Sequence, residues 1–206
     1  MRANKKYDAL SIFAILITSY LFIGWANSFE QIEKAAEGVE SISAEFIQEK
    51  HLKILTEPLV SKGVFYFKAP RSLRWEYISP IRSILVMHNG NIKRFIRRNS
   101  GLTEDSSINL QTMQMVLQEI TMWLKGHFDD NPNFTADLKA GRKIVLTPKE
   151  ESLSMMIKRI ELMLSSRPGV IKSVTIYESE DSFTNLEFRK VRLNSNVKDS
   201  LFREIK

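Results

Sequence analysis

Hydrophobic and aromatic residues alternate with polar ones through the segment from residue 59 to residue 91. The aromatic-rich runs of this segment are broken at Pro70 and Pro80, and the dipeptide Asn89-Gly90 follows a third apolar run. Proline cannot donate a hydrogen bond to a strand ladder, and Asn-Gly is typical of a tight hairpin turn. The pattern therefore predicts an antiparallel meander, with a return strand from Ile92 to Arg97.

The rest of the chain predicts two helices and further strands. Ser28 followed by Gln31 forms a capping-box pattern that opens a short amphipathic helix. A second helix is predicted by apolar residues at helical spacing, which Val116 and Trp123 extend into a wider stripe. Gly126 follows and predicts where this helix ends. Strands are expected from residue 43 to about 55, over 133–139, 142–146, 155–164 and 170–177, and from Phe183 to Leu193. About ten strands without a repeat favour one antiparallel sheet that curls toward a barrel.

Several of these strands are apolar on both faces. Residues 64–67, 84–87 and 157–164 carry apolar side chains at both parities, so both faces of the sheet require cover. The amphipathic segments can cover only one face. A curled sheet encloses a second apolar space on its concave side, which is either packed shut or left open as a ligand cavity. The pattern alone does not choose between these two outcomes.

Residues 1–26 have the pattern of a signal peptide. Arg2, Lys5 and Lys6 precede an apolar run from Ala9 to Ile23, and Gly24-Trp25-Ala26 offers small residues where a signal peptidase reads the chain. The alternative is an uncleaved anchor, although the run falls short of the roughly 20 apolar residues of a membrane span. We expect cleavage after Ala26, which leaves one domain over residues 27–206.

Composition and motifs exclude several classes of function. The chain has 206 residues, is 43% hydrophobic and 26% charged, and has a net charge of +6, which is too mild and dispersed to indicate nucleic-acid binding. It contains no cysteine, which excludes disulfides, thiolate metal sites and lipid attachment through a lipobox cysteine. His51, His88 and His127 are isolated, and phosphate-loop, dinucleotide and nucleophile-elbow motifs are missing. We therefore expect no enzyme activity, no cofactor and no metal.

One stretch of the meander resembles a known family. The succession of Pro70, Arg74-Trp75-Glu76-Tyr77, Pro80, Leu85-Val86 and Gly90 is similar to that of the LolA family of periplasmic lipoprotein carriers. The likeness continues at Phe46-Ile47-Gln48 and at residues 145–149, and weakly over 174–202. The resemblance implies an α+β, mainly β fold: an antiparallel incomplete barrel of about ten to eleven strands, with helices that cover or lid a concave apolar cavity.

The resemblance also implies where cargo lies. Trp75 and Tyr77 share one strand face with Leu73, and Arg74 and Glu76 share the other. From this strand alone, a core strand with a cross-strand ion pair is the better interpretation. The family favours an aromatic wall that faces acyl chains. The candidate cavity residues are Phe46, Phe65, Phe67, Leu73, Trp75, Tyr77 and Leu85.

The second helix has two interpretations. The pattern is that of an ordinary core-facing helix, whereas the family analogy makes it a lid that repacks around lipid, a use to which flexible methionines are suited. The candidate lid residues are Leu110, Met113, Leu117, Ile120 and Leu124.

Two features depart from the family pattern. Lys93, Arg94, Arg97 and Arg98 place four cations in a strand where relatives tend to carry aromatic residues. Such a run is most often a solvated strand end, but near a cavity mouth it would meet anionic head groups or a membrane surface. Ala69 stands where the family typically has an arginine that latches the lid, so the latch cannot be carried over.

By resemblance, the protein is expected to be a monomeric, non-catalytic carrier in the periplasm of a Gram-negative bacterium, with lipoprotein or lipid as cargo. An inner-membrane ABC exporter as donor and an outer-membrane receptor as acceptor follow from the family alone. The alternatives are a carrier of another lipid or lipid-linked intermediate and an envelope sensor that transfers no lipid. An anchored receptor is disfavoured by the absence of cysteine, and a lipid-hydrolysing enzyme by the absence of a catalytic motif.

Overall fold

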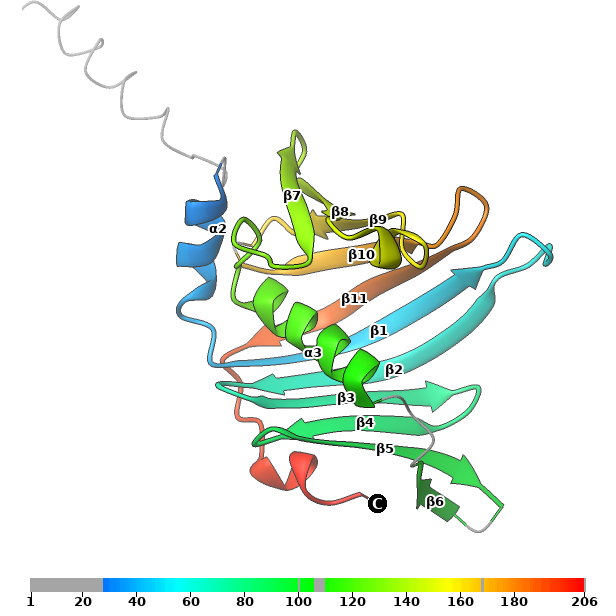
Figure 1. Ribbon diagram of the computed structural model, residues 1–206. Helices are drawn as coiled ribbons and strands as arrows, with labels where there is room; N and C mark the ends of the chain where they lie inside the picture. The colour runs from blue at the N-terminus through cyan, green and yellow to red at the C-terminus, as the bar shows by residue number, and fades with distance from the viewer. Residues whose placement is uncertain (1–27, 100, 106–109, 168, 206) are drawn as a thin grey trace, which may run out of the picture.

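A computed structural model describes residues 28–205 except 100, 106–109 and 168 (Figure 1). One antiparallel sheet of eleven strands has the order β6-β5-β4-β3-β2-β1-β11-β10-β9-β8-β7. Its edge strands β6 and β7 do not pair, so the sheet curls without closing, which confirms the predicted incomplete barrel. The strands are β1 (Ser41–His51), β2 (Leu59–Lys68), β3 (Ser72–Ser79), β4 (Ser83–His88), β5 (Asn91–Arg98), β6 (Gly101–Glu104), β7 (Phe134–Lys139), β8 (Lys143–Pro148), β9 (Arg159–Leu164), β10 (Ile171–Tyr177) and β11 (Phe183–Leu193).

Two helices lie where the pattern predicted them. α2 (Phe29–Ala36) begins after Ser28, whose side chain accepts a hydrogen bond from the Gln31 N–H at 3.3 Å. This bond satisfies one of the free donors of the first turn. α3 (Leu110–Leu124) crosses the concave side of the sheet, and its bounds agree with the predicted stripe (Figure 1).

The predicted strand over residues 155–164 is wrong in its first part. A short helix, α4 (Glu151–Ser154), precedes this segment, and the strand begins only at Arg159. Leu153 and Ile157 are four residues apart and both pack against the core, and the Ile157 N–H donates to the Leu153 carbonyl at 2.9 Å. Helical spacing therefore prevailed over alternation here. The first strand also ends earlier than expected, at His51, and β6 was not predicted.

The main core lies on the concave side, and aromatic residues of β1, β2 and β3 form part of it. Gly63 on β2 is opposite Phe46 on β1 and Tyr77 on β3. A Cβ atom at Gly63 would lie 2.1 Å from the Glu76 carbonyl oxygen and 2.5 Å from the Phe46 ring. The missing side chain lets Phe46 lie across β2 and contact the rings of Trp75 and Tyr77, at centroid distances of 4.9 and 5.2 Å.

The convex face of β3 and β4 is covered by the end of the chain. Val197 and Phe202 form a second apolar cluster with Ile84 and Val86, and the 3₁₀ helix η2 (Asp199–Phe202) lies against these strands. Nothing in the sequence pattern indicated this cover. It explains why β4 carries apolar residues at both parities.

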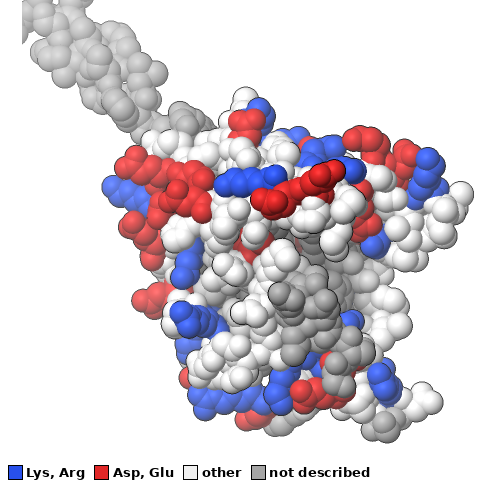
Figure 2. All heavy atoms as spheres, viewed as in Figure 1, with Lys and Arg blue, Asp and Glu red and all other residues white. Residues whose placement is uncertain are grey.

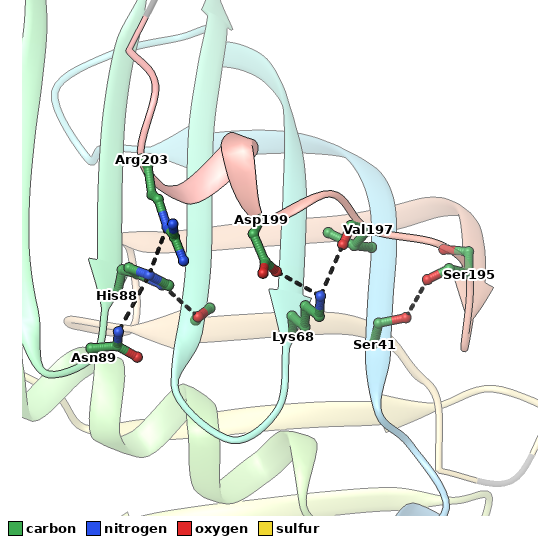
Figure 3. A network of polar contacts seen from close by, with 9 residues as sticks. Ser41, Lys68, His88, Asn89, Ser195, Val197, Asp199 and Arg203 are labelled. Carbon is green, nitrogen blue, oxygen red and sulfur yellow. Dashed lines mark hydrogen bonds and ion pairs between the residues drawn. The ribbon is translucent and has the colours of Figure 1, made fainter.

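Polar contacts fasten this C-terminal segment to the sheet (Figure 3). Lys68 Nζ lies 2.6 Å from Asp199 Oδ1, and Ser41 Oγ donates to the Ser195 carbonyl at 2.7 Å. The Arg74 guanidinium, 4% exposed, donates to the Leu201 carbonyl at 2.8 Å and to Glu76 Oε2 at 2.7 Å. An ion pair therefore exists on this face of β3, but it joins two residues of the same strand rather than two strands, and Arg74 also holds the end of the chain.

Replacing Gly63 with alanine tests the packing of the aromatic residues. We expect Gly63→Ala to lower the free energy of unfolding by about 1–3 kcal/mol, because the new methyl group meets backbone and ring atoms that cannot both move away. Urea denaturation followed by tryptophan fluorescence measures it. Gly38→Ala is the matched control, since nothing lies within 4 Å of that position. Equal stability of the two variants would contradict the close approach.

Candidate functional site: an apolar cavity under helix α3

A cavity of about 420 Å³ lies on the concave side, bounded by the sheet and α3. Its lining comes from β1, β2, β3, β4, β5, β10, β11 and α3, so most of the sheet contributes to it. The volume is within the range of ~300–1,000 Å³ that is typical of small-molecule sites. The sequence pattern allowed either a packed interior or a ligand cavity, and the structure has a cavity. In Figure 2 most of the described residues in the middle of this face are uncharged, and charged side chains lie above, below and at its left edge.

An aromatic wall forms one side of the cavity. Phe65 on β2 is in register with Trp75 on β3, and Phe188 on β11 completes the group. The Trp75 ring lies 5.3 Å from the Phe65 ring and 6.1 Å from the Phe188 ring, both at steep angles. Edge-to-face packing of this kind fixes the rings and gives the cavity a rigid wall. Phe188 was missed by the sequence analysis because β11 alone does not reveal which parity faces inward.

The predicted cavity residues fall into two groups. Phe65, Trp75, Tyr77 and Leu85 line the cavity. The other three are packed in the core and are not among its lining residues: Phe46, Phe67 and Leu73. Phe46 still supports the wall through its contact with Trp75.

The predicted lid residues also divide. Ile120 and Leu124 line the cavity, together with Val116 and Trp123. Leu117 points into the core and is fully buried. The side chains of Leu110 and Met113 lie outside the described residues. Helix α3 therefore both closes the cavity and anchors itself in the core, and its opening as a lid stays a prediction.

A buried polar network fixes the second half of α3. Glu119, 5% exposed, accepts hydrogen bonds from the side-chain amides of Asn131 and Asn133, each at 2.7 Å. Asn131 Oδ1 in turn accepts from the Phe134 N–H at 2.8 Å, at the start of β7. Buried and fully satisfied networks of this kind specify one arrangement. The sequence analysis missed it because the partners come from a loop beyond the helix.

Polar side chains gather at one end of the cavity. Gln48, Tyr77, Ser83, Glu178 and Thr184 line this end, whereas Ile42, Val170 and Leu193 line the other. Arg94 lines the middle of the cavity, in register through Leu85 with Trp75. The Tyr77 hydroxyl donates to Gln48 Oε1 at 2.7 Å. Burial raises the pKa of Tyr77 above its ordinary value, and the nearby charge of Arg94 offsets part of the rise, so the phenol keeps its proton at neutral pH.

Of the four predicted cations in β5, only Arg94 lines the cavity. Lys93 pairs with Glu104 at 3.2 Å, and Arg97 and Arg98 are exposed. Alternation along the strand separates Arg94 from Lys93 and Arg97, which point to the other face, whereas Arg98 shares the parity of Arg94 but is the last residue of the strand. Arg97 and Arg98 thus form a solvated strand end, whereas Arg94 belongs to the cavity.

Ala69 lies in the exposed turn between β2 and β3. Its N–H donates to the Glu40 carbonyl at 2.8 Å, and the residue is not among those that line the cavity. The altered-latch interpretation of this position stays a prediction.

Other kinds of site find little support in the described residues. No group of three or more metal-ligating side chains occurs within them, and the three histidines lie at separate places. His127 pairs with Glu33 at 3.0 Å, His51 stacks on Phe183, and His88 stacks on Phe202. None of the helices in this part of the chain has the length and apolar character that crossing a bilayer requires.

Comparison with known proteins defines the class. The family model described as outer membrane lipoprotein carrier protein LolA matches residues 37–204. The chain belongs to the LolA family. A search of curated proteins found no match.

Solved structures share the fold at low sequence identity. An uncharacterized conserved protein from Thermus thermophilus has a TM-score of 0.52 and 9% identity, covering 86% of this chain and 91% of that one. MucB in the Pseudomonas aeruginosa MucA/MucB complex has a TM-score of 0.50 and 14% identity over 84% of this chain and 58% of that one. A LolA superfamily protein from Nitrosomonas europaea has a TM-score of 0.44 and 10% identity, covering 84% and 94%.

Substitution of Glu119 tests whether the buried network fixes α3. We expect Glu119→Gln to lower the free energy of unfolding by about 1–3 kcal/mol, because an amide nitrogen then meets one of the two asparagine amides and a buried donor loses its acceptor. Urea denaturation gives the value. Gln118→Glu, at the neighbouring exposed position, is the control and should change stability by less than about 0.5 kcal/mol. No difference between the two variants would show that the network adds nothing.

Proposed function

We propose that this protein is a periplasmic carrier that holds the acyl chains of lipoproteins or other lipids in its apolar cavity. The observation that carries the proposal is a cavity with an aromatic wall, closed by a helix that also presents apolar side chains to it. Membership of the LolA family supports a binding protein rather than an enzyme. Each methylene group moved from water into such a cavity contributes about 0.8 kcal/mol.

The dimensions of the cavity suit one lipid tail. Ile42 and Gln48 both line it and are six residues apart on β1, which at ~3.3 Å per residue is roughly 20 Å. A lipid tail in one leaflet extends over about half of the ~30 Å hydrocarbon core of a bilayer, so roughly 15 Å. An extended acyl chain therefore fits along β1 within the cavity.

The route of transfer is the finer part of the proposal. Shuttling from the inner to the outer membrane, with an ABC exporter as donor and an outer-membrane receptor as acceptor, is supported by the family alone. Export through a signal peptide over residues 1–26 rests on the sequence pattern, and these residues lie outside the described part of the chain. A domain over residues 27–206 is part of the same proposal.

A carrier of another lipid is the second candidate, and Arg94 at the cavity wall favours it because a cation in the lining suits a cargo with an anionic group. Mass spectrometry of organic extracts tests both candidates on protein purified from its native periplasm. We expect an acylated molecule in stoichiometric amount, and its identity separates lipoprotein from other lipids. A ligand-free protein that instead copurifies with a membrane regulator would favour the sensor.

A charge in the cavity should weaken lipid binding more than it weakens folding. We expect Ile120→Asp to reduce the affinity for an apolar fluorescent probe, N-phenyl-1-naphthylamine, by at least about tenfold. The new carboxylate keeps water in the cavity, and a bound apolar probe would strip it of that hydration at a large cost in free energy. Probe titration alongside thermal melting measures both effects. Met115→Asp, on an exposed position of the same helix, is the matched control. Unchanged probe affinity in Ile120→Asp, with the fold intact, would contradict the proposed site.

A further inference from the structure

The two ends of the cavity differ in chemistry. At the end described above, Gln48, Ser83 and Thr184 bring hydrogen-bond donors from three different strands. Arg94 lies next to that end, where its charge acts on the Tyr77 hydroxyl. The opposite end is lined by aliphatic side chains such as Ile42 and Leu193. A cavity built only for hydrocarbon has no need of such donors, because a polar group in an apolar lining costs free energy unless it finds a partner.

The guanidinium of Arg94 is held at the cavity wall while most of its N–H donors have no hydrogen-bond acceptor among the described residues. Among the described residues its one polar partner is Asp105, with Nη1 at 3.6 Å from Oδ2. This distance exceeds that of a hydrogen bond, and an arginine has five N–H donors. Asp105 is 7% exposed, so it keeps the guanidinium near the cavity while most of its donors remain free for a ligand.

Gln48 supplies a second oriented donor. The Tyr77 hydroxyl donates to Gln48 Oε1 at 2.7 Å, which fixes the carboxamide with its nitrogen turned away from the phenol. No protein acceptor for Gln48 Nε2 occurs among the described residues. The carboxamide therefore offers N–H groups on the same side of the sheet as the guanidinium of Arg94.

The charges at this end leave an excess of donors. Arg94 and Glu178 are the two charged residues of the lining. Glu178 pairs with Lys50 at 3.0 Å, so its carboxylate has its own cation. A ligand group that enters this end meets a free guanidinium and an already paired carboxylate, which favours an anion over a cation.

From this arrangement we propose that the polar end of the cavity is a head-group site for an anionic amphiphile. A carboxylate or phosphate attached to an acyl chain pairs with Arg94 and accepts from Gln48, while the chain lies toward the aliphatic end at Ile42 and Leu193. This inference rests on the proposed function, since it requires that the cavity binds acyl chains. It adds that the cargo is selected by the charge next to its chain.

Three ligands with the same fourteen-carbon chain test the site: myristate, a lyso-phosphatidylglycerol and the uncharged monoacylglycerol. Displacement of N-phenyl-1-naphthylamine gives a Kd for each. We expect Arg94→Gln to weaken the anionic ligands by about tenfold, the effect of losing one charge-assisted hydrogen bond, and to leave the uncharged ligand within about twofold. Arg97→Gln, on the same strand with an exposed side chain, is the matched control and should leave all three within about twofold.

The outcomes separate the two levels of the proposal. Loss confined to myristate assigns the site to a free carboxylate, and loss confined to the lyso-lipid assigns it to a phosphate. Equal loss for charged and uncharged ligands, or no loss for any, overturns the head-group site while the cavity stands. Failure of all three ligands to displace the probe from the wild-type protein overturns the proposed function itself.

Discussion

The whole molecule depends on a sheet that is apolar on both faces. β4 places Ile84 and Val86 on the convex face and Leu85 on the concave face, so neither side can remain in water. The convex side of β3 and β4 is covered by the C-terminal segment, which Arg74 holds through the Leu201 carbonyl. Lys68 and Ser41 also hold it (Figure 3). Among the described helices α3 is the one that crosses the concave side, and one helix cannot fill the curve of eleven strands. The cavity is the space between the sheet and the helix that side chains do not fill.

Rigid support on both sides of the cavity keeps it from collapsing. Gly63 lets Phe46 cross over β2 and brace Trp75 from behind, while Glu119 joins α3 to the loop before β7. Both devices fix elements on opposite sides of the cavity at a set separation. A lining of flexible side chains on unsupported elements would close up in water, because the apolar surface would be buried at little cost.

The sequence predicted the architecture better than the site. Alternation, Pro70, Pro80 and Asn89-Gly90 located the meander, and the Leu110–Leu124 stripe located the helix, because these signals are local. Phe188, Asn131 and the cover by Val197 and Phe202 could not be found in the same way, since each acquires its role from a partner far along the chain. The failure at residues 155–158 has a local cause: Leu153 and Ile157 satisfy both a helical and a strand interpretation until their packing decides.

The placement of Arg94 shows how one residue of a charged run acquires a role of its own. Strand parity sends Lys93 and Arg97 away from the cavity and Arg94 toward it, so a cluster that looks uniform in sequence is divided by the pleat. The same parity places Leu85 beside Arg94 across the β4–β5 ladder. An apolar wall and a cation therefore meet at the same level of the sheet, and a ligand that contacts both must itself be amphiphilic.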